Sequence, residues 1–67
     1  MRSLPTGQPI GTFHALATRD GEACSRDGQE FYAINPKGTD AQGAELFEIR
    51  FRDGLWMLAT ADDLGLS

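Results

Sequence analysis

The sequence predicts a small, mainly β protein: an antiparallel meander of four to five strands that forms either a curved sheet or a small SH3-like barrel. The tripeptide Arg-Asp-Gly occurs three times, at residues 19–21, 26–28 and 52–54, each between segments with strand character. Asp-Gly is a strong signal for a two-residue hairpin turn, because glycine readily adopts positive φ and aspartate tolerates it. The segment 45–52 alternates apolar and charged side chains, which is typical of a half-buried strand. With 67 residues, the chain is expected to form one domain with a thin core.

The first eleven residues (1–11) are expected to form a flexible arm, and the remainder (12–67) a single small β domain. Two prolines and two glycines leave the arm few backbone donors and little regular structure. The alternation over 12–19 predicts a first strand, and residues 22–25 are expected to form a short second strand between two Asp-Gly turns. A third strand is predicted at 29–35, where aromatic and β-branched residues gather and which Pro36 is expected to end.

The last two strands are predicted to form the hairpin that supplies the core. A two-residue turn at Asp53-Gly54 would place Phe51 opposite Trp56 and Ile49 opposite Leu58. The apolar face of this hairpin would then consist of Phe47, Ile49, Phe51, Trp56 and Leu58. After it, Thr60 is expected to cap a short turn that carries two carboxylates at its start.

A competing interpretation makes residues 40–51 a helix, and the protein would then be α+β. Thr39 and Gln42 form a capping box, and three apolar residues of the segment share a helical face. Gly43 lies in the interior of this helix, and the alternation of charged and apolar residues would be scattered around it. The strand is therefore favoured.

Charge and composition narrow the classes of partner and of compartment. Ten acidic and six basic residues give a net charge of −4, which opposes direct binding to nucleic acid or to anionic membranes. The same charge favours a protein partner with a basic or mixed surface. A single cysteine forms no intrachain disulfide, and no apolar run is long enough for a signal peptide or a bilayer span. These features predict a cytoplasmic protein.

Residues suited to catalysis or metal binding are sparse. His14 and Cys24 are the sole histidine and cysteine, so a metal site would need carboxylates of unknown position. The expected strand pairing places these two residues on opposite faces, with Cys24 as a small core residue and no third member for a nucleophilic pair. The glycines fall singly and form no phosphate-binding loop. We therefore expect no catalysis, no cofactor and no bound metal.

The acidic residues supply the first functional hypothesis. Several lie at expected turn tips or near the end of the chain, where they could merge into one negative patch: Asp20, Asp27, Asp62 and Asp63. Such a patch can imitate the charge of a nucleic-acid backbone, as in some small phage-encoded inhibitors of host defence, including anti-CRISPR proteins. The similarity to these proteins is one of size and charge, with no shared motif. This hypothesis describes a non-catalytic binding protein, encoded by a phage or mobile element, that covers a surface of a larger nucleic-acid-handling host complex.

The second hypothesis is a small β-barrel adaptor or regulatory module that binds a peptide or a protein subunit. Its expected contact surface is the side of the last hairpin away from the aromatic core, which would carry Arg50, Arg52, Leu55 and Met57. Arginine and methionine are frequent at protein contacts. The exposed edge strands of such a sheet would also suit a second copy of the chain, so a homodimer is compatible with either hypothesis.

Overall fold

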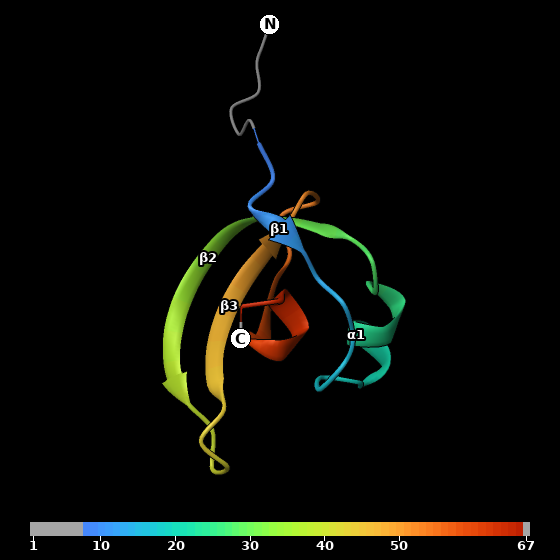
Figure 1. The fold of residues 1–67 in the computed structure, drawn as a ribbon. Helices are drawn as coiled ribbons and strands as arrows, with labels where there is room; N and C mark the ends of the chain where they lie inside the picture. Colours follow the sequence, from blue (N-terminus) through green and yellow to red (C-terminus); the bar gives the residue numbers. More distant parts are fainter. Residues whose placement is uncertain (1–7, 67) are drawn as a thin grey trace, which may run out of the picture.

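A computed structural model describes residues 8–66, which form one open antiparallel sheet of four strands with little helix (Figure 1). The elements are, in chain order, β1 (Gly11–Thr12), α1 (Gly21–Ser25), β2 (Glu30–Thr39), β3 (Glu45–Phe51), β4 (Trp56–Thr60) and the 3-10 turn η1 (Asp62–Leu64). Each strand pairs with its neighbour in sequence, in the order β1-β2-β3-β4. The predicted meander is confirmed, as an open curved sheet and not as a barrel.

The arm predicted at 1–11 is described only from residue 8 onward, and residues 1–7 lie outside the described part. Gly11 belongs to β1, where it pairs with Phe31. The N–H of Ile10 also donates to the carbonyl of Phe31, at 2.8 Å. The sheet therefore begins before residue 12, where the domain was expected to start.

The strand predicted at 22–25 is wrong, and the one predicted at 12–19 ends at Thr12. The chain then leaves the sheet and leads into α1, whose N-cap is Asp20. The Oδ1 atom of Asp20 accepts the N–H of Ala23 at 2.8 Å. Asp-Gly suits a helix start as well as a hairpin turn, because the aspartate side chain satisfies a free amide of the first turn. Ala23 is consequently buried, and Cys24 is exposed and not a core residue.

The strand interpretation of 45–52 is confirmed by β3, and the alternative helix over 40–51 is wrong. The Oδ1 atom of Asp40 accepts the N–H groups of Gln42 and Ala44, at 2.8 and 2.9 Å. These bonds close a tight loop between β2 and β3, because the aspartate side chain substitutes for a backbone carbonyl. Asp40, at the beginning of the alternative helix, thus serves to reverse the chain.

Pro36 lies inside β2 and does not end it, contrary to the prediction of a strand at 29–35. It lies opposite Phe47, next to an irregularity in the register between β2 and β3. The two residues of β1 pair only with the beginning of β2, so Pro36 lies on a free edge of the sheet. A missing backbone N–H is tolerated at such an edge.

The turn between β3 and β4 is one residue longer than predicted. The N–H of Phe51 donates to the carbonyl of Leu55, and the N–H of Gly54 donates to the carbonyl of Phe51, both at 2.9 Å. These bonds enclose a three-residue loop, with Gly54 at a φ of 92°. A type I turn followed by a left-handed glycine is a common form of three-residue hairpin. The register of β4 against β3 therefore shifts by one residue.

This shift moves each β4 side chain to the opposite face of the sheet. Met57 lies opposite Ile49 and is packed against the core, whereas Trp56 lies opposite Arg50. The predicted placement of Trp56 and Leu58 in the core is wrong, since both side chains are exposed on the outer face. The inner face of β4 instead contributes a buried alanine and the partly buried methionine.

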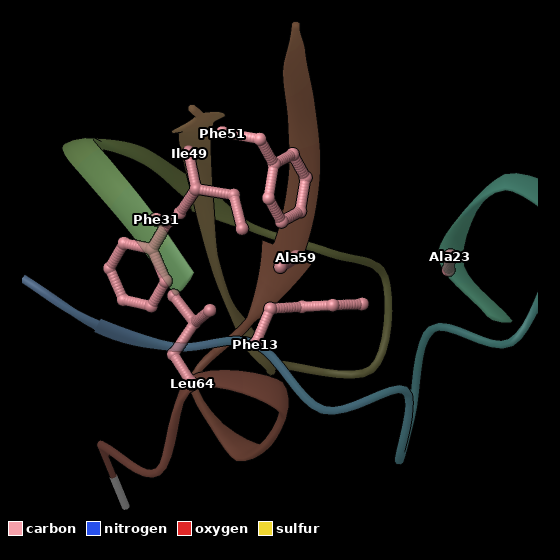
Figure 2. Packing of buried hydrophobic residues seen from close by; sticks show 7 residues of the cluster. All are labelled: Phe13, Ala23, Phe31, Ile49, Phe51, Ala59 and Leu64. Atoms are coloured by element: carbon pink, nitrogen blue, oxygen red, sulfur yellow. The ribbon is translucent and has the colours of Figure 1, made fainter. Parts of the chain in front are cut away.

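The core lies on the inner face of the sheet and is completed by residues from outside it. Its buried apolar members are Phe13, Ala23, Phe31, Ile49, Phe51, Ala59 and Leu64. Figure 2 shows these side chains, with Ala23 on α1 to one side of the others. The rings of Phe13 and Phe51 meet edge to face, with centroids 5.9 Å apart. Phe13 and Leu64 therefore fill the space that was predicted for Trp56 and Leu58.

Candidate functional site

Asp63, predicted to lie in an acidic surface patch, is fully buried. Its carboxylate accepts the N–H groups of Leu16, Ala17 and Thr18 at 3.0, 2.7 and 3.1 Å. It also accepts the hydroxyl and N–H groups of Thr60, and the hydroxyl of Thr18 at 2.6 Å. Burial alone would raise the pKa of Asp63, but the hydrogen bonds outweigh it and lower the pKa to about 2. Asp63 therefore joins the segment before α1 to the end of β4 and offers no atom to a partner.

The other three predicted aspartates lie at separate points of the fold. The Asp20 carboxylate caps α1. The Oδ1 atom of Asp27 accepts the N–H of Ala15 at 2.9 Å and lies 3.6 Å from Nδ1 of His14. Asp62 is exposed at the start of η1. Of the four carboxylates, only those of Asp27 and Asp62 are both exposed and free of a capping or buried role.

Arg26 forms a charged cluster that the sequence did not predict. Its guanidinium lies 4.8 Å from the centre of the Phe51 ring and donates to Glu22 at 2.6 Å and to Asp53 at 3.0 Å. The hydrogen bonds to Asp53 and then Glu22 raise the pKa of Arg26, and the same bond to Arg26 lowers the pKa of Asp53. Two of the three Arg-Asp-Gly copies thus meet, because Arg26 and Asp53 belong to different copies. The four-residue spacing of Glu22 and Arg26 would have indicated this pair if the helix had been recognised.

The residues predicted as an adaptor surface do not share one face of the sheet. The set is Arg50, Arg52, Leu55 and Met57. Arg50 lies on the outer face, whereas Met57 packs against the core on the inner face. Arg52 is exposed in the loop after β3, and Leu55 closes that loop opposite Phe51. The one-residue shift of register separates them.

The outer sides of β3 and β4 carry a different set of residues, of which the two on β4 are exposed and the two on β3 are partly buried. We name it the outer β4 face and define it by Glu48, Arg50, Trp56 and Leu58. Trp56 lies opposite Arg50, and Leu58 lies opposite Glu48. Trp56 and Leu58 stand two residues apart on β4 and therefore share one face of the strand. They are 43% and 50% exposed. The run Leu-Trp-Met-Leu is apolar at every position, so its sequence alone does not indicate which residues face outward.

A shallow hollow of about 200 Å³ lies at the beginning of β2, on the side of the loop after β3. It is lined by Gln29, Glu30, Tyr32 and Arg52. Sites for cofactors and drug-sized ligands usually measure about 300 to 1,000 Å³ and are largely apolar. This hollow is smaller than such a site.

The described residues bring together no group suited to metal binding. Across residues 8–66, no three side chains of His, Cys, Asp or Glu lie in an arrangement that could hold a metal ion. Cys24 is exposed on α1 and its thiol donates to the carbonyl of Arg19 at 3.4 Å, whereas His14 neighbours Asp27. Among the helices of the described segment, none is long and apolar enough to cross a membrane.

Comparison with known proteins finds no relative from which a function could be transferred, so the functional assignment rests on this geometry. No protein-family model, no curated protein and no solved structure matches the chain.

Proposed function

We propose that this chain is a small non-catalytic binding protein that covers a surface of a larger protein partner through the outer β4 face. The exposure of Trp56 and Leu58 carries the proposal. Both residues are apolar, and they stand side by side on an edge strand of a domain whose core is already filled by other residues. Tryptophan and arginine are enriched among the residues that dominate protein contacts. Arg50, directly opposite Trp56, completes such a combination.

The charges around these apolar residues suit a partner of mixed surface. The Oε1 atom of Glu48 lies 3.9 Å from Nζ of Lys37 on β2. Arg50, in contrast, forms no ion pair within the described residues. The face therefore presents one arginine available for a carboxylate or an aromatic ring, next to a tryptophan that can be desolvated. This is the peptide-binding or subunit-binding hypothesis, moved from the predicted set of residues to the outer β4 face.

The acidic-mimic hypothesis, with a phage inhibitor of a nucleic-acid-handling complex, stays a prediction. Its support is the net charge of −4. The geometry gives it less support than it gives the outer β4 face, because Asp63 is buried, Asp20 caps α1 and Asp53 is paired with Arg26. The exposed carboxylates that remain are spread over several elements.

The experiment is an affinity capture from host lysate with the wild-type chain, Trp56→Ser, Leu58→Ser and the control Leu16→Ser. Leu16 is 62% exposed but lies between β1 and α1 and does not belong to the outer β4 face, so it controls for the loss of one exposed apolar side chain. We expect the wild type and Leu16→Ser to capture the same partner. Each β4 variant should bind that partner at least tenfold more weakly, which corresponds to about 1.4 kcal/mol.

The salt dependence of the captured complex separates the two hypotheses. Contact through Trp56 and Leu58 should survive high salt, because apolar burial is not screened. Capture that is lost at high salt and in the double variant Asp27→Asn and Asp62→Asn, but is retained by Trp56→Ser, would instead support acidic mimicry. Circular dichroism of every variant confirms that the fold is retained before binding is compared.

A further inference from the structure

The two edges of the sheet differ in how well they are protected. Edge strands commonly avoid pairing with other chains by being short or by carrying charges, prolines or bulges. The first edge consists of β1, which has two residues and follows Pro9, and beyond it of the free part of β2, which carries Pro36, Lys37 and an irregularity in register beside Pro36. β4 has five residues, pairs with β3 without any irregularity, and carries neither charge nor proline from Leu55 through Ala61. The β4 edge is therefore open to another strand.

The hydrogen bonds of the last hairpin show which backbone groups of β4 point to this edge. Phe51 bonds to Leu55 at one end of the ladder, and Ala61 bonds to Glu45 at the other. Antiparallel pairing alternates, so the odd-numbered residues of β4 bond to β3 and the even-numbered ones point away from it. The N–H of Thr60 donates to Asp63, whereas the N–H groups of Trp56 and Leu58, by this alternation, point to the free edge. The free stretch of the edge thus coincides with the two exposed apolar side chains.

We propose that this edge pairs antiparallel with β4 of a second copy of the chain, about a two-fold axis that passes beside Met57. In this register Trp56 of each copy lies opposite Leu58 of the other. The N–H and C=O groups of these residues then close one continuous ladder between the two sheets. On the outer side, both tryptophans and both leucines meet in one apolar cluster, because the diagonal neighbours of a ladder lie within reach of aromatic side chains.

Charge complementarity argues for a second copy over an unrelated strand. The same register brings the loop that carries Arg52 beside the beginning of η1 in the other copy, where Asp62 lies. Both residues are exposed, and neither has an ion pair within the described part of the chain. They stand at opposite ends of β4, so a two-fold axis pairs each arginine with an aspartate at both ends of the interface. No like charges face each other along the ladder, because the strand carries none.

The pairing of two β4 strands does not depend on the proposed function, and it would enlarge the surface that the proposed function uses. Two outer β4 faces would become one continuous surface across the joined sheets. The ladder is short, so the contact belongs to the small, weakly associating class of interfaces. We expect a monomer–dimer equilibrium that shifts with protein concentration in the micromolar range.

The first test is sedimentation velocity over a range of concentrations, with charge-reversal variants. Arg52→Glu and Asp62→Lys should each weaken dimerisation severalfold, and the double variant should restore it, because it exchanges the two charges across the interface. Leu58→Lys should abolish the dimer, whereas Ile10→Lys, at the opposite edge of the sheet and 53% exposed, should leave it unchanged. A chain that stays monomeric at every concentration overturns the proposal and leaves the edge for a strand of another protein. A double variant as weak as the single ones overturns the register.

The second test is amide hydrogen exchange measured residue by residue at low and high protein concentration. The amides of Trp56 and Leu58 should become protected as concentration rises. Those of Met57 and Ala59 should be protected at both concentrations, because they bond to β3, and they serve as an internal control. A dimer in which Trp56 and Leu58 still exchange freely would overturn pairing through this edge.

Discussion

Replacement of Asp63 by Asn should lower the stability of this domain and remove most of its sensitivity to acid. The carboxylate accepts six hydrogen bonds from two segments far apart in the sequence. An asparagine of the same size keeps one acceptor oxygen, but it turns an NH2 group toward these donors, of which the N–H of Leu16 also donates to the carbonyl of His14 at 2.8 Å. A buried donor without a partner costs about 1–3 kcal/mol.

The magnitude of the acid sensitivity follows from the pKa of Asp63. The pKa falls from an ordinary value of 3.8 to about 2 in the folded state. Each pH unit of difference corresponds to about 1.36 kcal/mol, so the ionised carboxylate contributes roughly 2 kcal/mol. Because the folded pKa is the lower one, this contribution is fully present above about pH 5 and is lost as the pH falls toward 2. A domain of this size has a total stability of roughly 3–10 kcal/mol, so the loss is large.

Urea unfolding followed by far-ultraviolet circular dichroism, at a series of pH values from 7 to 2, measures this effect. The wild type should lose roughly 2 kcal/mol between about pH 5 and pH 2. Asp63→Asn should begin less stable at pH 7 and show a much shallower dependence on pH. Asp62→Asn, its exposed neighbour, is the matched control and should follow the wild type. Equal stability of Asp63→Asn and the wild type at pH 7, or the same acid dependence in both, would refute the assignment of Asp63 as the joining carboxylate.

Three further predictions concern the core, the loop after β3 and the arginine cluster. Phe51→Ala should lower the stability by about 3–5 kcal/mol, because a fully buried phenylalanine is lost, whereas Trp56→Ala should change the urea midpoint little because Trp56 is exposed. Gly54→Ala should lower the stability by about 1–2 kcal/mol, because its φ of 92° is unfavourable for alanine; the added methyl group meets no neighbouring atom, so the backbone strain is the whole effect. In the same urea titration, Gly21→Ala should stabilise α1 slightly, because alanine is the better helix former. Arg26→Ala should lower the melting temperature more than Arg26→Met, because a methionine side chain still covers the Phe51 ring. Equal melting temperatures of the two variants would contradict the packing of Arg26 on that ring.

The sequence predicted the later half of the fold well because its signals agree there. Residues 45–51 alternate clearly, and the loop 52–54 contains an Asp-Gly pair, so the β3–β4 hairpin and its place beside the core were found. The register was missed because Asp-Gly is compatible with two-residue and three-residue loops. The four apolar residues from Leu55 to Leu58 fit either register equally well.

The earlier half was mispredicted because its decisive contacts are not local. Asp20-Gly21 can begin a hairpin turn or a helix, and the choice depends on whether Ala23 can be buried against the rest of the protein. Phe13 is a core residue because it meets Phe51, which lies far along the chain. The role of Asp63 likewise requires the segment 16–18 to lie beside the end of β4, and no periodicity near either segment indicates that approach.

The charges of this chain show why composition was a weak guide to its candidate site. A net charge of −4 suggests a free acidic surface, yet several carboxylates are engaged within the fold. Asp63 is buried, Asp20 caps α1, and Asp53 forms an ion pair with Arg26. Carboxylates that serve as acceptors for backbone groups or as partners of an arginine are not available to a basic groove. The exposed tryptophan and leucine of the β4 edge are instead uncharged and available for contact. A search for partners should therefore begin with proteins, including this chain itself, that can add a strand or an apolar face to β4.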